Sequence, residues 1–332
     1  PALSLRFADP GSGPRQAPGL PPMLGFAGLS AHPDARAQAL AQMQADSQRP
    51  LNLAENAAAT FILFVLGPEH HLLYERIHHL AIDGYGMVLV TNRIAAHYAV
   101  LTDGAPAPEA FGALSLAGDE DAAYRASPRR AADRDWWHAE LADLPEVTGP
   151  APGRALSGHD FLRDSRALSG DLRSALAGYC GHHALGWPDV LAALCGAYLA
   201  RWTGGAAVIG LPFMARMGRK IANLPCMAMN VLPFRIGPDE DAPLPEWLAA
   251  QSRRMAQGRR RGLYRSELLR RELGLVGGTR RLYGPIVNVQ PFDKPPHFPG
   301  LDCRLHILGA GAVDDLTLTF RGDPDAGIIF EV

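Results

Sequence analysis

The spacing of apolar positions along the chain predicts alternating strands and helices. In the first half, the apolar run 60–66 and the run 72–78 flank a Gly-Pro-Glu turn, and we expect them to form a hairpin. After Gly84, apolar residues recur at three- and four-residue steps, which indicates a helix. A further helix is predicted over 35–48, whereas the Gly- and Pro-rich residues 8–35 read as a loop.

The second half shows the same mixture. Helices are predicted over 133–144 and 171–179, and from Pro188 to the glycines at 204–205; a long basic helix is expected over 246–273. The helix that starts at Pro188 carries four residues on one face: Leu191, Cys195, Tyr198 and Trp202. Six runs have the length and composition of strands: 208–213, 231–236, 285–290, 303–308, 316–320 and 328–332.

This succession of elements predicts an α/β fold of two lobes. The Pro- and Gly-rich stretch 144–158 is the best boundary, which gives lobes over 1–150 and 151–332. The chain starts just before the strand-like run 3–7 and stops within the run 328–332. We therefore expect both lobes to be incomplete and the sequence to be a fragment of a longer polypeptide.

Composition narrows the class of protein. Of the 332 residues, 47% are hydrophobic and 20% are charged, which is ordinary for a globular protein with a sizeable core. The net charge of −2 gives no overall attraction to nucleic acid or to a membrane, and no apolar run reaches the roughly 20 residues of a membrane span. The four cysteines lie far apart without a C-x-x-C pair, so reduced thiols are expected rather than disulfides or zinc ligands. A cytoplasmic enzyme fits these features.

Candidate chemistry lies where the hairpin meets the following helix, in His78-His79-Leu80-Ala81-Ile82-Asp83-Gly84. Adjacent side chains of a strand point to opposite faces, so one imidazole would face a substrate while the other packs, unless the strand has already ended. A neutral imidazole can accept a proton from an attacking amine. Asp83 could orient a histidine or pair with an arginine, and Gly84 permits a close approach. The competing interpretation is a structural histidine pair, because 70–71 and 182–183 are also His-His.

Several ordered segments make the chain resemble condensation domains of nonribosomal peptide synthetases, which carry the same His-His-x-x-x-Asp-Gly motif. The run 3–7 is similar to their Leu-Arg-x-Arg-Phe segment, with Ser4 in place of the first arginine. The run 210–216 is similar to Gly-x-Pro-x-x-Gly-Arg, with Ala215 in place of the second glycine. The run 230–235 matches Asn-x-Leu-Pro-x-Arg, and 285–290 resembles a later strand that helps to join the lobes.

Within the family, the sequences of three segments most resemble the condensation domain of enterobactin-type siderophore synthetases: 213–218, 284–288 and 314–316. Another departure from the family pattern follows the motif, where Tyr85-Gly86 stands in place of the more usual aromatic residue and serine.

The resemblance implies a chloramphenicol acetyltransferase-like pair of lobes with mixed sheets and a tunnel between them. It also implies amide formation between a donor acyl thioester and an acceptor aminoacyl thioester. Both would be held on phosphopantetheine by upstream and downstream carrier proteins, beside an adenylation domain of the parent chain. No cofactor or metal bound directly to this domain is implied.

The resemblance assigns roles to named residues. His79 would deprotonate or position the attacking amine beside His78, and the Gly84 backbone N–H would face the developing oxyanion. Asp83 would be structural and paired with Arg216. Two further residues of the matching segments would support the site: Asn230 and Asn288.

Other interpretations remain open. The chain could be a related acyltransferase that makes an ester or uses a free acceptor, or a catalytically silent module that docks carriers. Heterocyclisation is disfavoured because that subfamily replaces the first histidines with acids, and epimerisation is less favoured because of Asp83-Gly84. Ten arginines between 253 and 281 could dock an acidic carrier or form a solvated helix face. Nucleic-acid binding is less favoured, because only Tyr264 and Tyr283 accompany these arginines.

Overall fold

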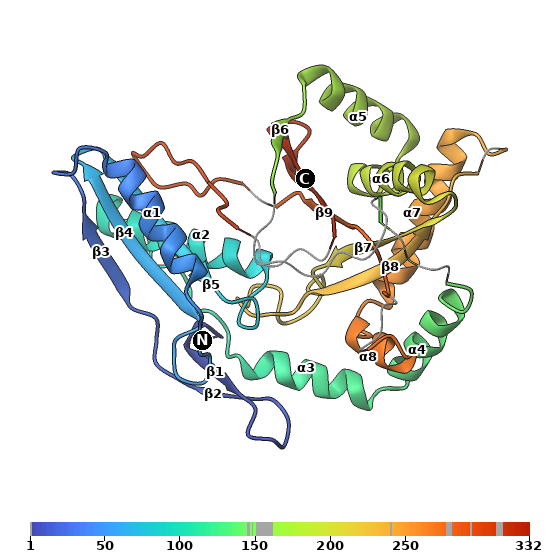
Figure 1. Ribbon diagram of the computed structural model, residues 1–332, viewed down its shortest axis with the longest axis horizontal. Coiled ribbons are helices and arrows are strands. Elements are labelled where there is room, and N and C mark those ends of the chain that lie inside the picture. The colour runs from blue at the N-terminus through green and yellow to red at the C-terminus, as the bar shows by residue number, and fades with distance from the viewer. Residues whose placement is uncertain are drawn as a thin grey trace. The chain divides into compact units, whose positions relative to one another are not determined.

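The computed structural model describes residues 2–144, 147, 149–150, 162–239, 241–276, 281–292, 294–309 and 315–332 (Figure 1). The chain forms two compact units: the first comprises Pro1–Val90, Glu109–Leu116 and Asn223–Ala228, and the second comprises Thr91–Pro108, Ala117–Ala222 and Met229–Val332. The expected boundary stretch 144–158 lies largely outside the described residues. The division into 1–150 and 151–332 stays a prediction, and the two compact units do not coincide with it.

The first unit is built on the predicted hairpin. Strands β4 (Ala59–Gly67) and β5 (His70–Ile77) pair antiparallel, and β3 (Leu24–Gly28) pairs parallel to β4, so the sheet order is β3-β4-β5. Helix α1 (Ala35–Gln48) begins where the Asp34 carboxylate accepts the Ala37 N–H, a normal N-cap. Its Ala39 and Met43 pack with Phe64 and Tyr74 in one hydrophobic cluster of this unit.

The expectation of a loop over 8–35 was wrong in part. A 3-10 turn (Ala2–Ser4) leads into β1 (Leu5–Ala8), which pairs antiparallel with β2 (Arg15–Pro18), and β3 lies in the same stretch. These strands have four or five residues each and are flanked by glycine and proline. Their pairing with other strands defines them, and local composition does not reveal such pairing.

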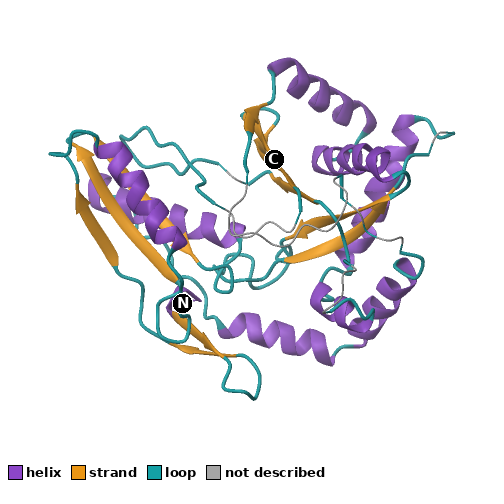
Figure 2. Cartoon of the chain, in the orientation of Figure 1, coloured by secondary structure: helices purple, strands orange, loops and turns teal. Residues whose placement is uncertain are grey.

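The second unit is built on a six-stranded mixed sheet of order β6-β11-β10-β9-β7-β8. Its strands are β6 (Ser165–Ala167), β7 (Ala207–Phe213), β8 (Asn230–Ile236), β9 (Ile286–Gln290), β10 (Thr317–Asp323) and β11 (Gly327–Glu331). Strand β9 is parallel to β10 and β7, and the other pairs are antiparallel. The helices that lie wholly in this unit are α4 (Pro128–Glu140), α5 (Gly170–His183), α6 (Trp187–Thr203), α7 (Leu244–Arg260) and α8 (Ser266–Glu272). Helices α2 (Gly84–Asp103) and α3 (Ser115–Ala126) each have residues in both units. Figure 2 shows all helices in purple and all strands in orange.

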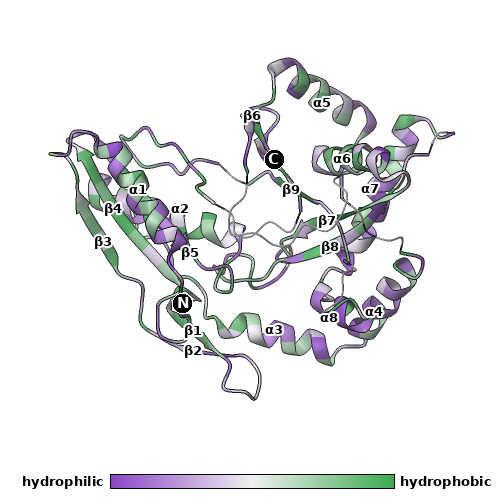
Figure 3. Ribbon diagram, in the orientation of Figure 1, coloured by the Kyte–Doolittle hydropathy of each residue, from purple (hydrophilic) through white to green (hydrophobic). Residues whose placement is uncertain are grey.

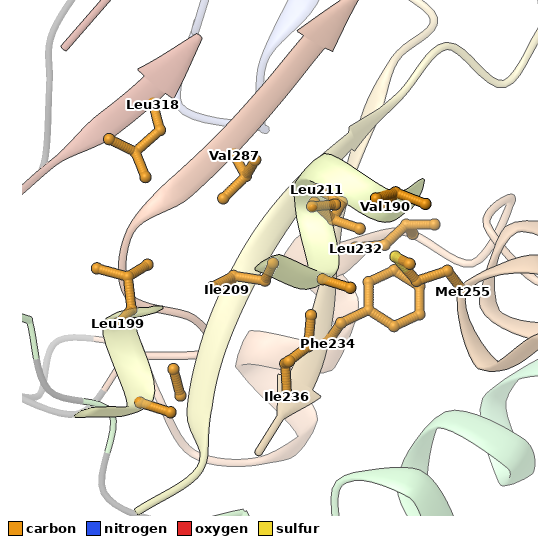
Figure 4. Packing of buried hydrophobic residues seen from close by; sticks show 14 of the residues in the cluster. Val190, Leu199, Ile209, Leu211, Leu232, Phe234, Ile236, Met255, Val287 and Leu318 are labelled. Atoms are coloured by element: carbon orange, nitrogen blue, oxygen red, sulfur yellow. The ribbon is translucent and has the colours of Figure 1, made fainter. Parts of the chain in front are cut away.

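The main hydrophobic core lies between this sheet and its helices. Phe234 of β8 and Met255 of α7 lie side by side in Figure 4, and the same cluster includes Leu199 of α6 and residues of β7, β9 and β10. Strands β7 and β8 lie toward the hydrophobic end of the scale, whereas α4 is mainly hydrophilic (Figure 3). Helix α4 nevertheless contributes Trp137 to this core, where its side chain is fully buried.

The long basic helix expected over 246–273 is two helices, because α7 ends at Arg260 and α8 begins at Ser266. The cause lies outside the segment itself. The Asn230 side-chain amide donates to the carbonyls of Gly262 and Tyr264, two acceptors that a continuous helix would use internally. A Cβ at Gly262 would also collide with the Phe213 ring, so the chain lies close to the end of β7 at this break.

The strand expected over 303–308 was also wrong. These residues have no strand partner among the described residues, and most of them are exposed. The other strand runs of the second half are confirmed to within three residues at each end. No helix among the described residues is long and apolar enough to cross a membrane.

Candidate active site

The histidine pair lies just beyond the end of a strand. Strand β5 ends at Ile77, and the His78 N–H still donates to the Ala58 carbonyl at 2.8 Å, which continues the pairing with β4 by one residue. The chain then turns, with the Ala81 N–H donating to the His78 carbonyl. The alternation of side chains along a strand therefore no longer applies to His78 and His79, and both side chains are exposed.

The two imidazoles differ in their partners. Nδ1 of His78 accepts the Leu80 N–H at 3.1 Å, so a neutral His78 carries its proton on Nε2. Desolvation of the ring lowers the pKa of His78, and its electrostatic interactions with the neighbouring His79 and Arg76 lower it further. The side chain of His79 has no hydrogen bond or ion pair with the described residues. His78 is therefore held neutral in one orientation, while His79 is available to a substrate.

Asp83 is buried and organises the turn. One carboxylate oxygen accepts the Gly86 N–H at 2.9 Å, and the Asp83 carbonyl accepts the Met87 N–H, so Asp83 is the N-cap of α2. The other carboxylate oxygen accepts the Ala228 N–H at 3.0 Å, and the Asp83 N–H donates to the Cys226 carbonyl. Asp83 thus binds the start of α2 to the segment 223–228, which belongs to the same unit.

The two glycines after Asp83 serve different purposes. Gly84 is the first residue of α2 and is exposed, and its N–H has no acceptor among the described residues, as expected of a first-turn donor. Gly86 is buried, and a Cβ there would collide with the side chain of Ile82. The family more often has serine at this position, but in this chain the side chain of Ile82 leaves no room for a Cβ at Gly86.

Arg216 and Ala215 lie in the second unit. Arg216 is fully buried, and its guanidinium donates to the Ile221 carbonyl at 3.1 Å, which closes the turn that follows β7. Ala215 has a φ of +53°, in the left-handed region that glycine adopts without strain. This conformation explains why the family pattern places a glycine there. The expected pairing of Asp83 with Arg216 stays a prediction.

Asn230 and Asn288 are also in the second unit. Asn230 is buried at the start of β8, where its side-chain oxygen accepts the Ser266 N–H at 3.1 Å in addition to the two hydrogen bonds that its amide donates. It fixes the connection between α7 and α8. Asn288 is half-buried in β9 opposite Thr319 of β10. The expected support of the active site by Asn230 and Asn288 stays a prediction.

The structure thus brings four predicted residues into one turn: His78, His79, Asp83 and Gly84. Sequence reasoning missed the segment 223–228, because it meets Asp83 through backbone groups that leave no signature in the sequence. The described residues contain no cluster of three or more His, Cys, Asp or Glu side chains that could hold a metal. The four cysteines are free.

Comparisons with known proteins identify the family to which the chain belongs. The model of the condensation domain family matches residues 25–298, and the chain therefore belongs to the condensation domains, the acyltransferases of nonribosomal peptide synthetases. The resemblance seen in the sequence is confirmed. The chain is also similar over 99% of its length to the structure of VibH, a condensation enzyme of this kind, with a TM-score of 0.87 and 28% identity over 77% of that chain. The mixed α/β fold class is confirmed by the same match.

Relatives among characterised proteins are much longer than this chain. It is 40% identical over 294 residues to the isonitrile lipopeptide synthase of Streptomyces coeruleorubidus, covering 88% of this chain and 20% of that protein. It is 30% identical over 309 residues to enterobactin synthase component F of Escherichia coli, covering 90% of this chain and 23% of that protein. The enterobactin-type likeness is thus present, but the first of these relatives has the higher identity. The chain spans about a fifth of each protein.

Proposed function

We propose that this domain forms an amide bond between a donor acyl thioester and an acceptor aminoacyl thioester, each carried on the phosphopantetheine of a carrier protein. The observation that carries the proposal is the turn at residues 78–84. An unpartnered, exposed imidazole at His79 stands beside a neutral, oriented His78, on a backbone fixed by buried Asp83. Family membership supplies the reaction class.

The proposed step uses only groups of this chain and its substrates. The acceptor amine attacks the donor carbonyl carbon, and the new C–N bond forms as the carbonyl oxygen takes negative charge. The imidazole of His79 accepts the proton that the amine loses, and the Gly84 N–H faces the developing oxyanion. The C–S bond then breaks, and the proton passes to the departing thiolate, which leaves the donor carrier with a free phosphopantetheine thiol.

Positioning contributes alongside proton transfer. Two substrates held end to end by their carriers react as if within one molecule, which supplies roughly 7–11 kcal/mol in the best-aligned cases. General-base help typically adds about 10²–10⁴-fold. We therefore expect loss of His79 to slow the reaction strongly without abolishing it.

The partners in this proposal are an upstream donor carrier, a downstream acceptor carrier and an adjacent adenylation domain of the parent polypeptide. The similarity to enterobactin synthase component F favours a siderophore-like peptide as the product of the parent polypeptide. We place the reaction in the cytoplasm, where four free cysteines fit a reducing compartment. No resident cofactor takes part, since phosphopantetheine arrives on the carriers.

The test uses the parent polypeptide with both carriers loaded, and intact mass spectrometry follows the carrier-bound species. We expect the donor mass to move onto the acceptor in the wild type, and His79→Ala to slow this transfer by about 10²–10⁴-fold. His71→Ala is the matched control, because His71 is an exposed histidine of the same hairpin. Equal rates for the two variants would show that His79 is not the base. Absence of transfer with every acyl pair would favour the silent module, and transfer only to a hydroxyl acceptor would favour the ester-forming enzyme.

A further inference from the structure

Met227 is an exposed apolar residue whose backbone is held beside the turn at residues 78–84. The Asp83 N–H donates to the Cys226 carbonyl at 3.3 Å, and the Ala228 N–H donates to the Asp83 carboxylate at 3.0 Å. These two hydrogen bonds lie on either side of Met227 along the chain, so they hold its backbone next to Asp83. Both sides of this contact belong to the same compact unit.

The exposure of the side chains in this segment distinguishes Met227 from its neighbours. Cys226 is 3% exposed and Ala228 is 4% exposed, whereas Met227 between them is 38% exposed. The two residues before Cys226 are buried as well. Because the backbones of both neighbours are fixed by hydrogen bonds, Met227 cannot turn into the core without breaking them. Its thioether side chain therefore stays at the surface beside the turn.

The turn itself offers a substrate mainly polar groups. These are the exposed imidazoles of His78 and His79 and the backbone N–H of Gly84. Sites for small organic groups are lined mostly by apolar side chains, with a few polar groups that fix orientation. Among the described residues, the turn exposes one large apolar side chain, Leu80, and the segment bound to the turn exposes one more, Met227. These two can supply the apolar contact that the polar groups cannot.

The position of Met227 relative to Gly84 indicates which part of the substrates it meets. In the proposed reaction, the Gly84 N–H faces the oxyanion that develops on the donor carbonyl. Gly84 directly follows Asp83, so their Cα atoms are about 3.8 Å apart, and the backbone of Met227 is bound next to Asp83. The acceptor amine lies instead at His79, five positions earlier in the chain. Met227 is therefore placed beside the donor carbonyl.

We propose that Met227 is a specificity-determining residue that contacts the hydrocarbon part of the donor acyl group, next to its thioester carbonyl. The inference rests on the proposed function, because the Gly84 N–H locates the donor carbonyl. Methionine is unbranched and polarisable, so its side chain adapts to the shape of an apolar group that packs against it. Met227 thus favours donors with a hydrocarbon chain over donors that have almost none.

The first test measures single-turnover acyl transfer in the parent polypeptide, with one acceptor throughout and a donor carrier loaded with acetyl or octanoyl. We expect Met227→Ala to lower the octanoyl-to-acetyl ratio of rates by about tenfold, because octanoyl loses an apolar contact that acetyl scarcely makes. Met227→Leu, which keeps an apolar side chain of similar volume, should retain most of the wild-type ratio. The matched control is Met23→Ala, which removes a methionine that is 80% exposed in the same unit and should leave the ratio unchanged.

The second test uses the wild-type polypeptide and does not depend on turnover. Dilute hydrogen peroxide converts accessible methionines to sulfoxides, and peptide mass spectrometry follows each methionine separately. The donor carrier bears octanoyl through a stable amide in place of the thioester. We expect it to slow the oxidation of Met227 at least about twofold, because contact with the chain removes access to the sulfur. The oxidation of Met23 should not change, and an aminoacyl acceptor carrier alone should not protect Met227.

A merely structural role of Met227 would slow both donors alike and leave their ratio unchanged in Met227→Ala, and that result would overturn the inference. Protection of Met227 by the acceptor carrier alone, or by neither carrier, would overturn it as well. The two proposals are separable. If the wild type transfers no acyl group, the proposed function fails, whereas protection of Met227 by the donor carrier would still support the contact.

Discussion

At the scale of single residues, the backbone conformation of Ala215 explains a glycine in the family pattern. Ala215 occupies the left-handed region at a position where the family pattern has glycine, and its methyl group is buried. A non-glycine residue in that region costs about 1–2 kcal/mol. Replacement by glycine removes this strain but also removes a buried methyl group and adds freedom to the unfolded chain.

A matched pair of variants isolates the strain. Ala207 is equally buried at the start of β7 and has no positive φ, so Ala207→Gly loses a methyl group without relieving strain. We expect Ala215→Gly to be less destabilising than Ala207→Gly by about 1–2 kcal/mol. Chemical denaturation of the two variants and the wild type measures the difference. Equal losses would mean that Ala215 is not strained.

Among elements, β11 depends on a charged cluster at its end. Glu331 accepts hydrogen bonds from Arg321 of β10 at 2.7 Å and from Arg163, which precedes β6. Burial alone would raise the pKa of Glu331, but the hydrogen bond from Arg163 and the charges of both arginines outweigh it and hold the pKa below the usual 4.5. The carboxylate therefore ties together three neighbouring strands while it is ionised.

The sign of the pH dependence follows from this lowered pKa. The stabilisation by Glu331 is fully present above pH 4.5 and is lost as the pH falls through the lower pKa of the folded state. We expect Glu331→Gln to reduce the free energy of unfolding at pH 7 by about 1.5–3 kcal/mol and to flatten its decline in acid. Denaturation from pH 7 to pH 3 checks both effects, with the exposed Glu69→Gln as control. An acid slope equal to that of the wild type would refute this role of Glu331.

The elements also show what sequence periodicity can and cannot predict. The hairpin, α1, α6 and the turn at 78–84 follow from local spacing, because each signal lies within the element itself. The break between α7 and α8 depends on Asn230, which lies 30 residues before it, and β3 exists only through its pairing with β4. The hydrogen bond from the Ala228 N–H to the Asp83 carboxylate also could not be predicted, because a pattern of side chains does not show which backbone N–H a carboxylate will bind.

On the scale of the whole molecule, the two units have cores of different size. The first unit has fewer buried apolar residues: Ala39, Met43, Phe64 and Tyr74 form one cluster, and others such as Phe61 and Ile82 are buried outside it. The core of the second unit extends from α4 through five strands of the sheet. In the first unit, the sheet ends at β3, whose Leu24 and Phe26 are largely exposed. Because buried apolar area sets the cost of opening a region, we expect the first unit to open more easily.

Two amides with equal burial test this difference. Phe64 in the central strand of the first sheet and Ile209 in an interior strand of the second are both 0% exposed, so exposure cannot separate them. We expect the Phe64 amide to exchange with deuterium at least about tenfold faster than the Ile209 amide, because its exchange requires opening of the smaller core. Native-state hydrogen exchange resolved by residue measures both rates. Equal rates would mean that the two units open together, and slower exchange at Phe64 would show that the small core, with its bonds from Asp83 to the segment 223–228, is the more stable of the two.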